Sequence, residues 1–434
     1  MLQSETVKKY DTYKDSGIEW IGEIPQNWDV KRLKVLAKLQ TGNTPPKEND
    51  VSAYYTDEGF LWVKPDNLSG FSPIKNTNEY LNEEGYKIAR VVPKGTPLVC
   101  CIGSIGKYGV AEQDVAFNQQ INAVIFNKMM DNKFGLYHIS CQEEQHWYYA
   151  NGNVVQILNT QNQGKLLFAC PPINEQKQIA EYLDKKCGEI DRIVETEKAV
   201  IEKLKEYKQS IITEAVTKGL DKSVPLKDSG IEWIGKIPQH WETIRLKYKF
   251  RIKKDIAGKE GFDILSVTQK GLKIKDISNN EGQLAMDYSK YQIVEPTDFV
   301  MNHMDLLTGW VDCSKFSGVT SPDYRVFVNI DKQKCDNEYY KHIFQTCYRN
   351  KIFFGLGQGV SDLGRWRLQA DKFLNFVISV PPLAEQEKIN DFINNKCSEI
   401  DKAIADKEQV IEKFTEYKKS LIYECVTGKR KVVE

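Results

Sequence analysis

The sequence lacks the features of a membrane protein, a secreted protein and a metalloprotein. Its 434 residues contain no run of about 18 apolar residues, which excludes a membrane-spanning helix. The N-terminal segment has no apolar signal core, so a cytoplasmic protein is expected. The five histidines form no HExxH or HxxxH pattern, and no metal site is predicted. The ten cysteines lack CxxC spacing, which favours reduced, mostly buried thiols.

Sequence motifs of common enzymes are also missing. GSIGK at 103–107 is not a phosphate loop, because GxxxxGK[ST] is absent. No GxSxG elbow occurs, and CPPI at 170–173 and VPPL at 380–383 do not match the [DN]PP[YF] motif of amino-methyltransferases. We therefore expect no catalytic residues. A stand-alone methyltransferase or nuclease with degenerate motifs stays open as an alternative.

What the chain does contain is a long internal repeat. KDSGIEWIGEIPQNW at 14–28 recurs as KDSGIEWIGKIPQHW at 227–241, with 13 of 15 positions identical. The segments 171–220 and 381–430 match at 22 of 50 positions. A spacing near 210 residues indicates domain duplication, since solenoid repeats are much shorter, roughly 20–50 residues. We call these repeated segments the frame, and the two diverged segments that they enclose the inserts. The repetition of the frame predicts a pseudo-two-fold arrangement.

The later segment of each repeat is predicted to be a long helix. Each opens with a proline pair, places a glutamate (Glu175 or Glu385) in the first turn, and ends at a glycine (Gly219 or Gly428). No proline interrupts either segment. About 45 residues at 1.5 Å rise would make a helix on the order of 65 Å, able to set a fixed spacing.

Apolar residues recur along both helices in alternating steps of three and four, which is a heptad seam. The predicted seam of the first helix is Ile190, Ile193, Glu197, Val200, Leu204, Tyr207 and Ile211. That of the second is Ile400, Ala403, Lys407, Val410, Phe414, Tyr417 and Leu421. Because such a seam needs a partner, we predict an antiparallel coiled coil between the two copies. The alternative is that each helix packs only on its own domain.

The inserts, roughly 30–165 and 243–378, mix short apolar or alternating runs with Gly, Pro and Asn, which predicts α+β domains. A stretch from Thr96 aligns without a gap to one from Thr297, so the two inserts are expected to share a fold but differ in their loops.

Those loops carry side chains suited to reading DNA bases. The candidates are Ser104, Lys107, Tyr108, Gln119 and Gln120 in the first insert, and Ser266, Thr268, Gln269, Lys270, Asn302, Asp305, Thr308, Ser321 and Arg325 in the second. The stretch 243–275 holds ten Lys or Arg against three Asp or Glu, although the net charge of the chain is zero. Such a stripe could neutralise phosphates; its dense part contains Lys247, Lys249, Arg251, Lys253 and Lys254. The alternative for each residue is a turn or solvated-surface role.

The duplicated motifs resemble the specificity (S) subunit of Type I restriction–modification systems over essentially the whole chain. The resemblance rests on SGIEWIG-IPQ-W before each insert, PPxxEQ at 171–176 and 381–386, LSVTQKG at 265–271 and GVTSPDY at 318–324. It implies target recognition domains at 1–168 and 221–378, with conserved helices at 169–220 and 379–434. Each domain would read one half of a bipartite asymmetric target in double-stranded DNA.

The resemblance also implies partners. Two modification subunits, carrying S-adenosylmethionine, would dock on the coiled coil and methylate adenine, and restriction subunits would cleave DNA with ATP and Mg²⁺. The chain itself would then need no cofactor and no membrane. A coiled-coil scaffold that does not bind DNA is the remaining alternative.

Overall fold

The computed structural model describes residues 8–46, 53–152, 154–276, 287–331, 335–358 and 366–432. The chain divides into two compact units. Unit 1 comprises Met1–Glu197 and Gln409–Glu434, and unit 2 comprises Lys198–Glu408. Each unit therefore contains one insert and a part of each long helix. Among the described residues, no helix has the length and apolarity needed to cross a bilayer.

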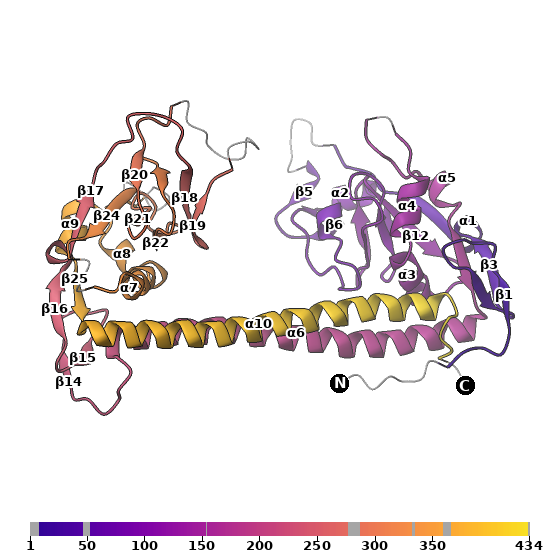
Figure 1. Ribbon diagram of the computed structural model, residues 1–434. Coiled ribbons are helices and arrows are strands. Elements are labelled where there is room, and N and C mark those ends of the chain that lie inside the picture. The colour runs from indigo at the N-terminus through magenta and orange to yellow at the C-terminus, as the bar shows by residue number, and fades with distance from the viewer. Residues whose placement is uncertain are drawn as a thin grey trace. The chain divides into compact units, whose positions relative to one another are not determined.

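The insert of unit 1 is built on two main sheets and two short strand pairs (Figure 1). The first sheet has the order β10 (Tyr108–Gly109), β9 (Leu98–Cys100), β12 (Ile121–Phe126) and β4 (Ala37–Thr41). The second has the order β5 (Tyr55–Thr56), β7 (Tyr80–Leu81), β6 (Phe60–Val63), β11 (Val115–Phe117) and β8 (Val91–Val92). The pairs are β1 (Tyr13–Asp15) with β2 (Glu23–Pro25), and β3 (Asp29–Arg32) with β13 (Leu167–Cys170). The helices are α1 (Leu33–Leu36), η2 (Pro65–Asn67), α2 (Glu83–Ile88), α3 (Asn132–Ser140), α4 (Glu143–Tyr149) and α5 (Thr160–Gln163).

The insert of unit 2 repeats this topology, except that no counterpart of β5 occurs among its described residues. Its first sheet has the order β22 (Val311–Cys313), β21 (Phe299–Met301), β24 (Arg325–Asn329) and β17 (Phe250–Lys253). Its second has the order β19 (Gly271–Ile274), β18 (Ile264–Thr268), β23 (Gly318–Thr320) and β20 (Gln292–Val294). The pairs are β14 (Leu226–Asp228) with β15 (Lys236–Pro238), and β16 (Glu242–Arg245) with β25 (Val377–Val380). The helices are η3 (Leu246–Tyr248), α7 (Asn337–Arg349), α8 (Ile352–Gly355) and α9 (Ala370–Asn375).

The matching strand orders confirm that the inserts share one α+β fold. Even the parallel pair within each second sheet recurs, as β6 with β11 and β18 with β23. The ungapped alignment from Thr96 and Thr297, however, is wrong beyond its first strand. Val99 pairs with Tyr108, whereas Val300 pairs with Asp312, so the turn in unit 2 is three residues longer. Sequence similarity was too low to place this insertion.

The long helices are α6 (Ile173–Lys218) and α10 (Leu383–Val426), close to their predicted limits. Each follows a proline pair. Gly219, directly after α6, has φ +72°, and Gly428, shortly after α10, has φ +75°. This left-handed conformation is accessible to glycine at little cost, and it ends the helix.

Contacts inside each unit show that the helices pair antiparallel. In unit 1, Trp28 contacts both Glu175, near the start of α6, and Gly428, beyond the end of α10. Sixteen residues further along α6 from Glu175, Asp191 is ion-paired at 2.7 Å with Lys418, which precedes Gly428. Residue numbers thus increase along α6 in the direction in which they decrease along α10. The two helices are antiparallel, which confirms the predicted antiparallel coiled coil in this unit (Figure 1).

Unit 2 repeats the arrangement with the helix roles exchanged. Trp241 contacts Glu385, near the start of α10, and Gly219, after the end of α6. Lys208 of α6 is ion-paired with Asp401 of α10 at 2.7 Å. The repeated tryptophan and glutamate of the frame therefore hold one helix start and one helix end against each insert.

The buried positions of α6 differ by one residue from part of the predicted seam. Ile193 and Tyr207 are 38% and 58% exposed, whereas Ile201, which follows Val200, is 6% exposed. Val194 and Lys208 are half-buried beside the exposed pair. Ile190 is buried and Leu204 and Ile211 are half-buried, as expected of seam positions. Adjacent apolar residues at 193–194 and 200–201 satisfy the same spacing, so periodicity could not choose between them.

Several histidines are buried inside the units, and they make folding sensitive to acid. Burial lowers the pKa of His138 to about 3 and the pKa values of His146 and His342 to about 4. Because these folded-state pKa values lie below the unfolded value of about 6.5, protons bind the unfolded chain preferentially. Stability is therefore complete above pH 6.5 and is lost as pH falls toward 4.

We expect the free energy of unfolding to fall by about 1 kcal/mol per buried histidine between pH 7 and 5.5. Denaturant titrations at the two pH values measure this loss. His342→Gln, which cannot titrate, should lose less stability than the wild type over this range. An unfolding midpoint that is unchanged between pH 7 and 5.5 would contradict the expectation.

Candidate nucleic-acid interface

Four of the predicted base-reading residues of unit 2, namely Ser266, Asn302, Asp305 and Ser321, come together around a hollow of about 410 Å³. Ser266 comes from β18, Asn302 follows β21, and Ser321 follows β23. The hollow is also lined by three tyrosines and one carboxylate that the sequence analysis missed, namely Tyr288, Tyr291, Tyr324 and Asp323. The interleaved aromatic and basic residues of YSKY at 288–291 were the signal that could have found two of them.

Asn302 is the predicted reader best suited to contact a base. Its side-chain oxygen accepts a hydrogen bond from the Met304 backbone N–H at 3.3 Å. Among the described residues, its side-chain amide nitrogen donates to none. An asparagine amide that lines a hollow with donors still available can pair with a base edge.

Other predicted residues of the same loops are used in turns. The Asp305 carboxylate accepts from the backbone N–H groups of Leu307 and Thr308, both at 3.0 Å, and from the Thr308 hydroxyl. The Thr268 hydroxyl donates to the Gly271 carbonyl at 2.9 Å, which closes the turn between β18 and β19. These contacts favour the alternative role in turns for Thr268 and Thr308.

The LSVTQKG segment is divided between two hollows. Ser266 lines the one that contains Asn302, whereas Gln269 and Lys270 line a second hollow of about 430 Å³. The Gln269 side chain is exposed, and its amide donates a long hydrogen bond of 3.3 Å to the Thr308 carbonyl. Gln269 thus keeps most of its hydrogen-bonding capacity for another molecule.

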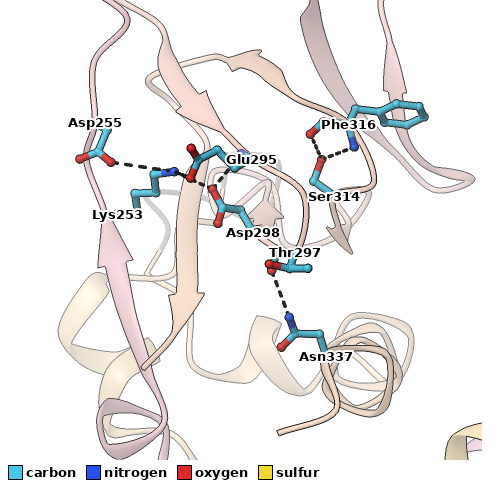
Figure 2. A network of polar contacts seen from close by, with 8 residues as sticks. All are labelled: Lys253, Asp255, Glu295, Thr297, Asp298, Ser314, Phe316 and Asn337. Atoms are coloured by element: carbon cyan, nitrogen blue, oxygen red, sulfur yellow. Dashed lines mark hydrogen bonds and ion pairs between the residues drawn. The ribbon is translucent and has the colours of Figure 1, made fainter. Parts of the chain in front are cut away.

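The basic stripe is not uniformly exposed. Figure 2 shows Lys253 surrounded by Asp298, Glu295 and Asp255, and its ammonium lies 2.8, 3.0 and 3.9 Å from their carboxylates. The Lys253 side chain is only 7% exposed. A buried ammonium needs such partners, so this charge is neutralised within the fold. The prediction of Lys253 as a DNA contact is corrected accordingly.

The rest of the stripe faces solvent in varying degree. Lys247, Arg251 and Lys254 are exposed, and Lys249 is half-buried. Arg251 alternates with buried Phe250 along β17, as expected for a strand at a domain surface. These side chains can still meet phosphates. Arg325, by contrast, is buried at the start of β24 and lines a third hollow.

The predicted residues of unit 1 are more dispersed. Ser104 and Gln119 are exposed, and the Thr44 hydroxyl donates to the Gln119 side chain. Lys107 donates to the Pro65 carbonyl at 2.8 Å, and Gln120 accepts from the Asn118 amide at 2.9 Å. The half-buried Tyr108 packs edge-on against Phe71, and burial raises the pKa of its hydroxyl. Ser104, Lys107 and Gln119 are thus the exposed members of this set.

No group of three or more His, Cys, Asp or Glu side chains suited to hold a metal ion occurs among the residues that the structure describes. The cysteines are free thiols, and most are buried.

Comparison with solved structures supports the fold. The chain superposes with a TM-score of 0.66 and 11% identity on a chain from a study of complex assembly and conformational transition of the type I R-M system, over 93% of this chain and 98% of that one. The HsdS subunit from Thermoanaerobacter tengcongensis matches with a TM-score of 0.50 and 12% identity, over 93% and 98% of the two chains.

Two proteins of similar sequence cover nearly the whole chain. The Type I restriction enzyme MjaVIII specificity subunit of Methanocaldococcus jannaschii is 23% identical over 433 residues, which is 94% of either chain. The putative type I restriction enzyme MjaX specificity subunit of the same organism is 24% identical over 429 residues, 95% of this chain and 96% of that one. The family model of the Type I restriction modification DNA specificity domain matches twice, at residues 25–206 and 239–413. With both of its inserts matched, the chain belongs to the family of Type I restriction–modification DNA specificity proteins.

Proposed function

We propose that each recognition domain reads one half of a bipartite, asymmetric DNA sequence within a complete Type I restriction–modification complex. The observation that carries this proposal is the duplication of one fold with different loops. The turn after β21 is three residues longer than the turn after β9, and it carries Asn302, which contributes to a hollow with Ser266 and Ser321. Two copies of one scaffold with different surface chemistry suit the reading of two different sequences.

In this proposal the chain has no catalytic role. Two modification subunits would bind S-adenosylmethionine and methylate adenine, and restriction subunits would use ATP and Mg²⁺ to cleave DNA. The coiled coil of α6 and α10 would dock the modification subunits and fix the gap between the two half-sites. Exposed apolar side chains on α6, such as Ile193 and Tyr207, offer contact area for a docked protein.

The test is to co-express the chain with its adenine methyltransferase partner and map methylated adenines in the DNA. A two-part motif with a fixed gap is expected. Calorimetry on the isolated chain should detect no S-adenosylmethionine binding, and detected binding would favour a stand-alone methyltransferase. A complex that does not distinguish any duplex from random DNA at matched salt would instead favour a scaffold role.

Binding measurements on the assembled complex should distinguish residues that contact bases from residues that contact phosphates. Gln269→Ala is expected to cost on the order of 1–3 kcal/mol on the cognate duplex only, because a lost base contact removes discrimination. Arg251→Ala should weaken binding to cognate and one-base-changed duplexes alike and reduce the salt slope by about one.

Titrations at several salt concentrations measure both effects. Gln119→Ala is the matched variant in the other insert, and its loss should map to bases of the other half-site. If Gln269→Ala folds normally and loses affinity equally for all duplexes, Gln269 is not a base reader.

A further inference from the structure

One hollow of unit 2 has a volume of about 770 Å³, and the described residues that line it carry an excess of positive charge. Its lining comes from the end of β17 and the residues that follow it, from the start of β24, and from the residues that lead into α9. Its lining contains the cations Lys254, Arg325 and Arg367 and, among the residues that the structure describes, a single carboxylate, Asp371. We call it the arginine hollow.

Arg325 is fixed in the wall of the arginine hollow and is only 5% exposed. One guanidinium nitrogen, Nη2, donates to the Leu368 carbonyl at 2.8 Å, and the guanidinium carbon lies 5.2 Å from the centre of the Phe373 ring. The other terminal nitrogen, Nη1, is buried without a hydrogen-bond partner. Among the described residues, no carboxylate forms an ion pair with Arg325.

An arrangement of this kind is costly for the folded protein in isolation. A buried charge is destabilising unless it is paired, and a buried donor without an acceptor destabilises the folded state as well. Burial lowers the pKa of Arg325 to about 10, so the guanidinium keeps its charge at neutral pH. An anion in the hollow would satisfy both the charge and the donor.

A second buried polar group lines the same hollow. The Nδ1 atom of His303 is buried and has no hydrogen-bond partner. Burial and the nearby Arg325 and Arg367 lower the pKa of His303 to about 4, so the imidazole is neutral at pH 7. His303 can therefore donate one hydrogen bond to an anion without adding charge.

We propose that the arginine hollow binds one backbone phosphate of the DNA target, with Arg325 and Arg367 as its main donors. This inference rests on the proposed DNA-reading function and adds a specific anchoring site to it. Guanidinium groups match the oxygens of a phosphate through paired hydrogen bonds. The bound phosphate fixes the register of unit 2 on the duplex while the hollow around Asn302, which shares Tyr324 with this one, contacts the bases.

A phosphate suits the site better than a guanine edge does. Arg325 is held by the Leu368 carbonyl and the Phe373 ring, and it cannot extend far beyond the wall of the hollow. Base edges lie within the grooves of the duplex, whereas phosphates project from its outside. An immobile, recessed guanidinium can therefore be reached by a phosphate more readily than by a base.

The test is a scan of the cognate duplex with single neutral methylphosphonates, using the complex with its modification subunits. Because Arg325 is buried and its replacement could disturb folding, the main variant is Arg367→Ala, an exposed residue of the same lining. Lys372→Ala, an exposed cation next to Asp371 that does not line the hollow, is the matched control.

For the wild type, one methylphosphonate position in the half-site read by unit 2 should weaken binding by about ten-fold, as expected for a lost charge-assisted hydrogen bond. The same modification should have a clearly smaller effect in Arg367→Ala, where Arg325 is the only one of the two arginines left to contact that phosphate, but its full effect in Lys372→Ala. This loss of coupling, without any change in base preference, supports the proposal.

Three results would overturn it. The methylphosphonate effects could be the same in Arg367→Ala as in the wild type. Arg367→Ala could instead relax the preference for guanine at one position, which would mean base reading. Alternatively, inorganic phosphate could bind the full chain in calorimetry while the scan shows no sensitive position, which would mean a free-anion site. If the complex preferred no duplex over random DNA, the proposed function itself would be refuted. That result differs from the three above, which overturn only the phosphate site.

Discussion

Exchanging residues 246–376 for the corresponding segment of another specificity subunit is expected to change one half of the recognised DNA sequence completely and leave the other half unchanged. The exchange keeps the pair β16 with β25 and the contact of Trp241 with Glu385, so the new insert joins an intact frame. It replaces Ser266, Asn302 and Ser321, whose hollow belongs to unit 2 alone.

Sequencing of methylated adenines measures the outcome of this exchange. The reciprocal exchange of residues 33–166 keeps the pair β3 with β13, and should alter only the other half. If either exchange alters both halves of the motif in a well-folded complex, the two domains do not read DNA independently.

Trp241→Ala is expected to destabilise unit 2 by about 3–5 kcal/mol, since it removes a large, fully buried side chain and leaves a cavity. It also removes the indole N–H that donates to the Glu385 carboxylate at 3.1 Å. Trp28→Ala removes the equivalent contact with Glu175, also 3.1 Å, and should destabilise unit 1 instead. The two variants are each other's control.

Hydrogen exchange at rising denaturant concentration can report on each unit separately, which a single unfolding curve cannot do for a chain of two units. Glu385→Gln, which keeps an acceptor for the Trp241 indole, should lose much less stability than Trp241→Ala. A loss below about 1 kcal/mol for Trp241→Ala, or equal loosening of both units, would show that the tryptophan does not anchor the helices.

Local signals in the sequence predicted the frame correctly. Proline pairs and glycines bounded α6 and α10, because they act on the backbone within a few residues. The repeat predicted that the inserts share a fold, and the paired strand orders confirm it. The resemblance of the repeated motifs to Type I specificity subunits agrees with the two family matches.

The sequence by itself thus determined the duplicated frame, the long helices and the family, because each of these depends on local chain properties or on direct repetition. Only the tertiary structure decided which side chains reach the surface. Lys253 belongs to a basic stripe by sequence, yet its partners Glu295 and Asp298 lie 42 and 45 residues away along the chain. The choice of Val194 over Ile193 in the seam and the recessed position of Arg325 likewise follow from packing between distant segments, which local spacing cannot encode.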